Sequence, residues 1–111
     1  MFEMEFVETS VFTAQVQSLL TDDEYRMLQE TLIENPRAGS VIRATGGIRK
    51  VRTSMAARGK RGGARVIYFI VHEDQIGLLF MYAKNLQADL SPAQKKTLTL
   101  VVKQWQAKRN S

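Results

Sequence analysis

Residues 60–84 read KRGGARVIYFIVHEDQIGLLFMYAK, and this stretch decides the fold. Two largely apolar segments, 64–71 and 76–84, flank the polar residues HEDQ, which predict a tight turn between two antiparallel strands. With the turn centred between Glu73 and Asp74, Arg65 pairs with Tyr82 and shares its face of the sheet. Lys84 follows two residues further along the same face.

The remaining elements are predicted from periodicity and capping patterns. MEFVE (4–8) alternates like a strand, and TDDE (21–24) and SPAQ (91–94) are capping boxes that begin helices. A first helix precedes the TDDE box, GGIRKVR (46–52) reads as a strand, and 53–63 reads as a mobile loop. We therefore expect one α+β domain, residues 1–111, with a small, largely antiparallel sheet, an N-terminal helical hairpin and a C-terminal helix. The apolar strands need cover on both faces, from helices or a partner.

The charge is distributed unevenly along the chain, whose net charge is +5. Residues 1–36 hold eight acids and one base, whereas residues 37–65 hold nine bases and no acid. A solvated surface is the ordinary explanation of a charge run. Nine bases without a compensating carboxylate repel one another, however, so a polyanionic partner is the better prediction.

The predicted register brings basic side chains to one end of the sheet. Lys50 and Arg52 share one face of the strand that leads toward Arg65, so we expect a basic cleft that also contains Tyr82 and Lys84. Simpler explanations exist: long basic chains often extend over a core edge, and Tyr82 can be a core aromatic. The convergence of several cations favours a functional site.

Other classes of site are not favoured. The chain lacks cysteine, and its one histidine, His72, lies in the turn about 20 Å from Arg65, so we expect neither a metal site nor a cofactor. Ser54 stands where a phosphate-binding loop needs glycine. A helix-turn-helix regulator is disfavoured because the bases lie in strands and a loop. The acidic N-terminal residues and the lack of a long apolar run predict a cytoplasmic protein with no membrane segment.

Three segments, TGGIRKVR, GKRGGARVIYF and YAKNLQADLS, closely resemble the RelE/HigB branch of bacterial toxin-antitoxin systems. The resemblance implies a RelE-like fold and a ribosome-dependent mRNA endonuclease that needs no metal. It also implies a HigA-like antitoxin with a helix-turn-helix domain. By this resemblance the catalytic residues are Lys50, Arg52, Arg65 and Lys84, and Tyr82 joins them from its position in the predicted cleft.

The basic residues nearest to this cleft are candidates for RNA binding, and they are Arg49, Arg58, Lys60 and Arg61. Two alternative functions remain at this point. The superfamily includes ParE-type inhibitors of DNA gyrase, which cleave nothing, and a plain nucleic-acid-binding module would carry the same basic segment. The presence of both Arg65 and Lys84 favours the nuclease.

Overall fold

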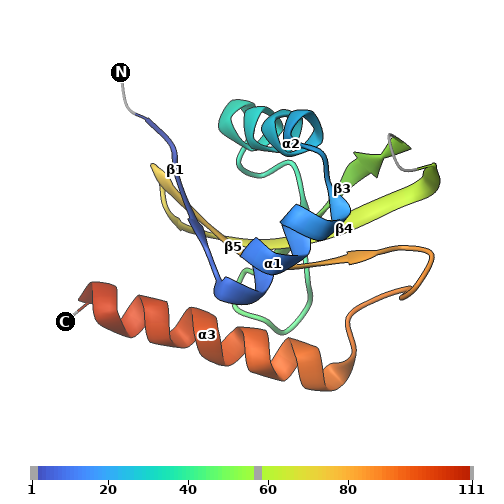
Figure 1. Ribbon diagram of the computed structural model, residues 1–111. Helices are drawn as coiled ribbons and strands as arrows, with labels where there is room; N and C mark the ends of the chain where they lie inside the picture. Colours follow the sequence, from blue (N-terminus) through green and yellow to red (C-terminus); the bar gives the residue numbers. More distant parts are fainter. Residues whose placement is uncertain (1–2, 57–58, 111) are drawn as a thin grey trace.

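The computed structural model describes residues 3–56 and 59–110. It is an α+β fold, as the sequence predicts (Figure 1). In chain order the elements are β1 (Glu5–Glu8), α1 (Ser10–Leu19), α2 (Asp22–Glu34), β2 (Ser40–Val41), β3 (Arg49–Met55), β4 (Lys60–His72), β5 (Gln75–Ala83) and α3 (Pro92–Asn110).

The strands form one sheet in the order β1-β5-β4-β3-β2. β1 pairs with β5 in parallel, and the other neighbours are antiparallel, which confirms the predicted, largely antiparallel sheet. The prediction of a loop over 53–63 is wrong at both ends, since β3 continues to Met55 and β4 begins at Lys60. The predicted turn at Glu73 and Asp74 is confirmed.

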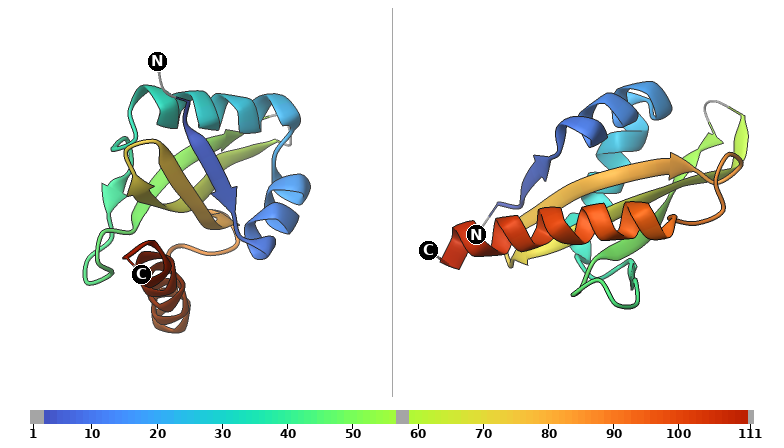
Figure 2. Two further views of the ribbon diagram at one scale, coloured as in Figure 1. Left: turned by 90° about the vertical axis from the view of Figure 1, so that its left-hand side faces the viewer. Right: turned by 90° about the horizontal axis from the view of Figure 1, so that it is seen from below.

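Helices cover both faces of the sheet, as the apolar strands require. In Figures 1 and 2, α2 lies above the sheet and α3 lies below it. Phe12 of α1 and Leu32 of α2 belong to the buried cluster on one face, together with Val66 and Tyr68 of β4. Leu98 and Val102 of α3, in the buried cluster of the other face, pack with Ile67 and Phe69 of β4.

Both predicted capping boxes are present. The Thr21 hydroxyl accepts a hydrogen bond from the Glu24 N–H, and the Glu24 carboxylate accepts one from the Thr21 N–H. Ser91 and Gln94 make the same reciprocal pair, and Pro92 follows as the first residue of α3. Because proline has no N–H and a fixed φ, it suits this first helical position. None of the helices in the described part of the chain combines the length and apolarity needed to cross a bilayer.

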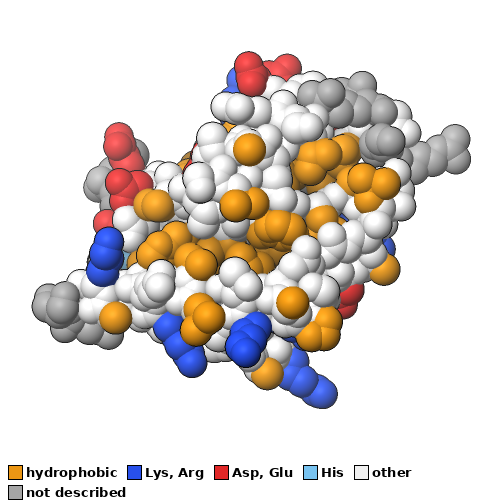
Figure 3. Space-filling view, turned by 60° about the horizontal axis from the view of Figure 1, so that its bottom comes forward, with side chains coloured by type: hydrophobic (Ala, Val, Ile, Leu, Met, Phe, Trp, Pro, Cys, Tyr) orange, Lys and Arg blue, Asp and Glu red, His pale blue; other side chains and the backbone are white. Residues whose placement is uncertain are grey.

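α3 leaves part of its face of the sheet open. A groove of about 310 Å³ runs between α3, β5 and the start of α1. Figure 3 shows hydrophobic side chains gathered in a hollow along this helix. Its apolar walls come from Val11, Leu79, Phe80, Leu98 and Val101.

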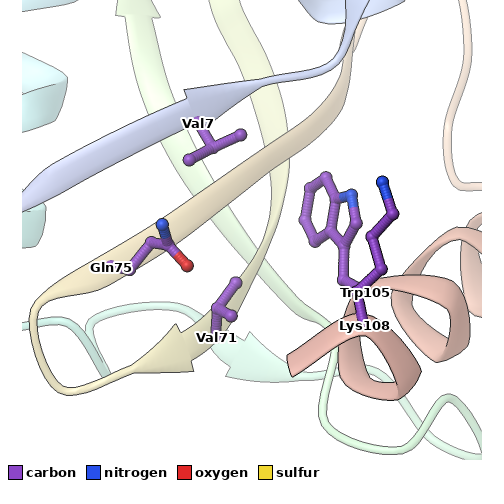
Figure 4. A pocket seen from close by; sticks show the side chains of 5 residues that line it. All are labelled: Val7, Val71, Gln75, Trp105 and Lys108. Carbon is purple, nitrogen blue, oxygen red and sulfur yellow. The ribbon is translucent and has the colours of Figure 1, made fainter. Parts of the chain in front are cut away.

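Trp105 holds the C-terminal half of α3 against the sheet. A second hollow of about 260 Å³ lies here, and Figure 4 shows Trp105 and Lys108 across it from Val7 and Gln75. The indole lies directly over Gly77 of β5. A Cβ at position 77 would be 2.0 Å from the Trp105 Cζ3 atom, closer than any real contact. Glycine is therefore required at 77 by packing.

Replacing Gly77 with alanine should lower the free energy of unfolding by roughly 2 kcal/mol, because the added methyl group displaces the indole. Urea denaturation followed by circular dichroism measures this change. In a Trp105→Ala background the same substitution should cost much less, since the clashing ring is gone. Equal costs in both backgrounds would show that Trp105 is not the constraint.

Candidate active site

Four of the five predicted catalytic residues lie on one face of three adjacent strands, and the fifth, Lys84, follows directly after β5. Arg65 of β4 pairs with Arg52 of β3 on one side and with Tyr82 of β5 on the other. Directly paired residues share a face, and Lys50 shares it because it lies two residues from Arg52. The Lys84 N–H donates to the Gly63 carbonyl oxygen at 3.0 Å, which holds Lys84 beside this end of β4. The predicted pairing of Arg65 with Tyr82 is confirmed. The row lies on the face that α3 covers further along, where Tyr82 joins the α3 cluster.

Arg65 is held at the centre of this row by the backbone. Its Nη1 atom donates to the carbonyl oxygens of Gly62 at 3.1 Å and Ala64 at 3.4 Å. Gly63, between them, has a φ of +66°, and a Cβ there would be 2.4 Å from the Thr53 carbonyl oxygen. Any other residue at 63 would therefore push β3 and β4 apart and shift Arg65.

Both lysines contact the segment that joins β5 to α3. Lys84 Nζ donates to the Ala88 carbonyl oxygen at 2.6 Å, and Lys50 Nζ lies 3.4 Å from Asp89 Oδ1. The Gln87 side chain donates to the Asp89 carbonyl oxygen and to Gln94, so this segment is also tied to the first turn of α3. Residues 84–91 therefore form an ordered wall of the site.

The sequence reasoning missed Asp89. Its carboxylate accepts a hydrogen bond from the Leu90 N–H at 2.9 Å, and this bond, with help from the nearby Lys50 and Lys95 charges, holds the Asp89 pKa below its usual range. One signal was available, because Asp89 is the only acid after Asp74. An acid that stands alone in a basic part of the sequence is a better candidate for a site residue than one of many acids.

The Tyr82 side chain is almost fully buried, with 5% of its surface exposed. Its hydroxyl makes no hydrogen bond of normal geometry with any described residue. Burial raises the pKa of the Tyr82 phenol, the Asp89 charge raises it further, and Arg65 opposes both. Tyr82 is thus a protonated phenol at neutral pH, and the lack of a regular hydrogen bond from its hydroxyl to a described residue is unusual for a buried polar group.

The predicted RNA-binding residues are placed differently. Arg49 pairs with Tyr68 and points to the opposite face from Lys50, where its Nη1 donates to the Gly39 carbonyl oxygen at 2.7 Å. It holds the segment before β2 and does not join the site. Arg58 and the side chains of Lys60 and Arg61 lie outside the described residues.

Within residues 3–56 and 59–110, no group of three or more histidine, cysteine or acidic side chains gathers as metal ligands do. His72 ends β4 at the opposite end of the hairpin from Arg65, where its ring contacts the Asp74 carboxylate. The chemistry that the site residues offer is therefore that of lysine, arginine and tyrosine.

A small α+β scaffold that carries clustered cations beside a phenol is suited to bind an anionic ligand. Residues 10–111 match the family described as the RelE toxin of the RelE/RelB toxin-antitoxin system. The chain belongs to this family, which confirms the resemblance seen in the sequence. It is accordingly the toxin of a toxin-antitoxin pair and has an antitoxin as its partner.

Proposed function

We propose that this toxin is a ribosome-dependent mRNA endonuclease of the HigB type, acting in the cytoplasm without a metal or cofactor. One observation carries the proposal: Arg52, Arg65 and Tyr82 are directly paired across three strands, Lys50 and Lys84 lie beside this row, and the buried Tyr82 hydroxyl makes no regular hydrogen bond with a described residue. Arg52 and Arg65 are directly paired, so an anion bound beside them meets two guanidinium groups, which bind phosphate oxygens well. A phosphate of the RNA backbone supplies both the anion and an acceptor for the hydroxyl.

Metal-free cleavage uses the 2′-hydroxyl of the RNA as the nucleophile. Its oxygen attacks the adjacent phosphorus, its proton passes to a base, and the 5′-oxygen leaves with a proton from an acid. Arg52 and Arg65 are proposed to stabilise the charge that develops on the phosphorane. Tyr82 suits the acid role because its phenol stays protonated, and the deprotonated form of Lys84 suits the base role, since Lys50 contacts the Asp89 carboxylate.

The proposed RNA contacts outside the catalytic row rest on the sequence alone. Arg58, Lys60 and Arg61 follow β3 in the chain, and we propose that they bind backbone phosphates on either side of the cut. Such contacts are similar in the ground and transition states, so they contribute to affinity and to its salt dependence. The ribosome is proposed to present the mRNA so that the 2′-oxygen aligns with its phosphorus.

In cells, induction of the toxin alone should stop growth by stopping translation. Primer extension on abundant messages should show new 5′ ends within translated codons, and these should disappear when translation initiation is blocked. Growth arrest with intact messages and damaged DNA would instead indicate the ParE-type inhibition of gyrase.

Replacing Arg65 or Lys84 with alanine should reduce single-turnover cleavage of ribosome-bound mRNA by roughly two to three orders of magnitude, as loss of one transition-state donor does. Ribosome affinity should change little. Lys60→Ala should instead weaken binding and leave the cleavage step nearly intact. Lys103 is an exposed lysine on α3, and Lys103→Ala is the matched control for loss of a positive charge. This variant should behave like the unchanged toxin. A loss of affinity in proportion to rate for Arg65→Ala would mark the cleft as a binding surface only.

We further propose that the antitoxin places an amphipathic helix with an acidic flank in the apolar groove beside α3. Strand addition to β5 is blocked there, because Gln15 accepts the Met81 N–H bond and the Thr9 hydroxyl donates to the Leu79 carbonyl oxygen. The α3 sequence contains five bases and no acid. A second copy of the toxin would set one basic α3 beside another, whereas an acidic helix complements it.

Val11 tests this placement because its side chain lines the groove and is 52% exposed. The antitoxin for this test is the protein encoded in an adjacent reading frame. Val11→Asp should weaken its binding at least tenfold, because the new carboxylate would be buried against apolar atoms beside an acidic helix. Ile33→Asp is the control, being 54% exposed on α2 and away from the groove. Isothermal titration with separately refolded proteins measures both. Equal affinity for the two variants would place the antitoxin elsewhere.

A further inference from the structure

The Asp89 carboxylate contacts the cationic site. Its Oδ1 atom lies 3.4 Å from Lys50 Nζ and accepts the Leu90 N–H at 2.9 Å. The contact joins residues 39 positions apart in the chain, so the fold and not local sequence creates it. The Asp89 side chain is 64% exposed, and the pair therefore contributes little to stability.

The position of this carboxylate is set by its surroundings. Gln87 binds the Asp89 carbonyl oxygen at 2.9 Å, and Lys84 binds the Ala88 carbonyl oxygen at 2.6 Å. The Ser91–Gln94 capping box follows at once and fixes the start of α3. Since several hydrogen bonds hold this backbone, Asp89 is presented to Lys50 from a rigid support.

The same carboxylate also acts on Tyr82. Its negative charge opposes formation of the phenolate, and this adds to the effect of burial on the phenol. Arg65 of β4 opposes this influence on Tyr82. The other cations of the neighbouring elements are Lys50 and Arg52 of β3, Lys84 directly after β5 and Lys95 of α3. Without the Asp89 charge, nearby cations would lower the Tyr82 pKa toward its ordinary value, and burial alone would be left to oppose them.

We propose that Asp89 is a positioning residue of the active site, which fixes the Lys50 ammonium group at the cleft and, together with burial, keeps the Tyr82 hydroxyl protonated as a proton donor. This inference deepens the proposed function and rests on it where cleavage is concerned. Asp89 touches no reacting atom in this role. It acts through Lys50 by contact and through Tyr82 by charge.

The direct test is a titration of Tyr82, followed by the ¹³Cζ resonance of tyrosine. Asp89→Asn should shift the Tyr82 titration to lower pH, because the charge that opposes phenolate is gone, while Asp89→Glu should retain most of the original value. Asp74→Asn, at the opposite end of the hairpin, is the control and should leave Tyr82 unchanged. An unchanged Tyr82 titration in Asp89→Asn would overturn the proposal.

Cleavage of ribosome-bound mRNA provides a second readout. For Asp89→Asn, the alkaline limb of the plot of cleavage rate against pH should move to lower pH, in parallel with the Tyr82 titration. The maximal rate should fall about tenfold, as it does when other residues that support a reactive group are replaced. KM should not rise, since the variant removes negative charge from an RNA site. A raised KM with an unmoved limb would show that Asp89 only shapes the binding surface, and would overturn the proposal.

The two readouts separate this inference from the proposed function. A lowered Tyr82 titration in a protein that cleaves no RNA would support the electrostatic effect of Asp89 on Tyr82 and would refute only the nuclease assignment. If Arg65→Ala abolishes cleavage while Asp89→Asn cleaves with the pH profile of the unchanged toxin, the nuclease assignment is supported and the role of Asp89 is refuted. Thermal melts of each variant exclude unfolding as the cause.

Discussion

The pairing of Arg65 with Tyr82 across the β4–β5 hairpin is the constraint on which the site depends. The register is not uniform between this pair and the turn. It shifts by one residue between Ile70 and His72 and shifts back between Ile67 and Tyr68. A single uncompensated shift would turn Tyr82 to the other face of the sheet. The second irregularity, at Leu79, places Leu79 and Phe80 on the α3 face together and restores the register before the site.

Glycines allow the backbone to approach neighbouring groups where the fold needs it. Gly77 admits the Trp105 ring against β5, and Gly63 admits the Thr53 carbonyl beside Arg65. The first contact holds α3 to the sheet, and the second holds β3 to β4. Through the 84–91 segment, the start of α3 also contacts both lysines of the site. Packing and site geometry are therefore linked through a few close backbone contacts.

The sequence predicts the local features well and the long-range ones less well. The capping boxes at Thr21 and Ser91 depend on residues three positions apart, and both form. The 53–63 segment was misread because glycine suggests flexibility, while Gly63 in fact permits close strand pairing. Arg49 was assigned to RNA binding, yet alternation along β3 turns it away from Lys50. Asp89 was missed because its partner lies 39 residues earlier in the chain.

The central claim is that the scissile phosphate binds between Arg65 and Tyr82. The most direct measurement is a cryo-electron microscopy structure of the toxin on a translating ribosome, with the 2′-hydroxyl at the cut site methylated to prevent attack. The account predicts the scissile phosphate within hydrogen-bond distance, about 3 Å, of the Arg65 guanidinium and the Tyr82 hydroxyl. A phosphate backbone that follows the basic face of α3, with Tyr82 still buried and unpartnered, would contradict it.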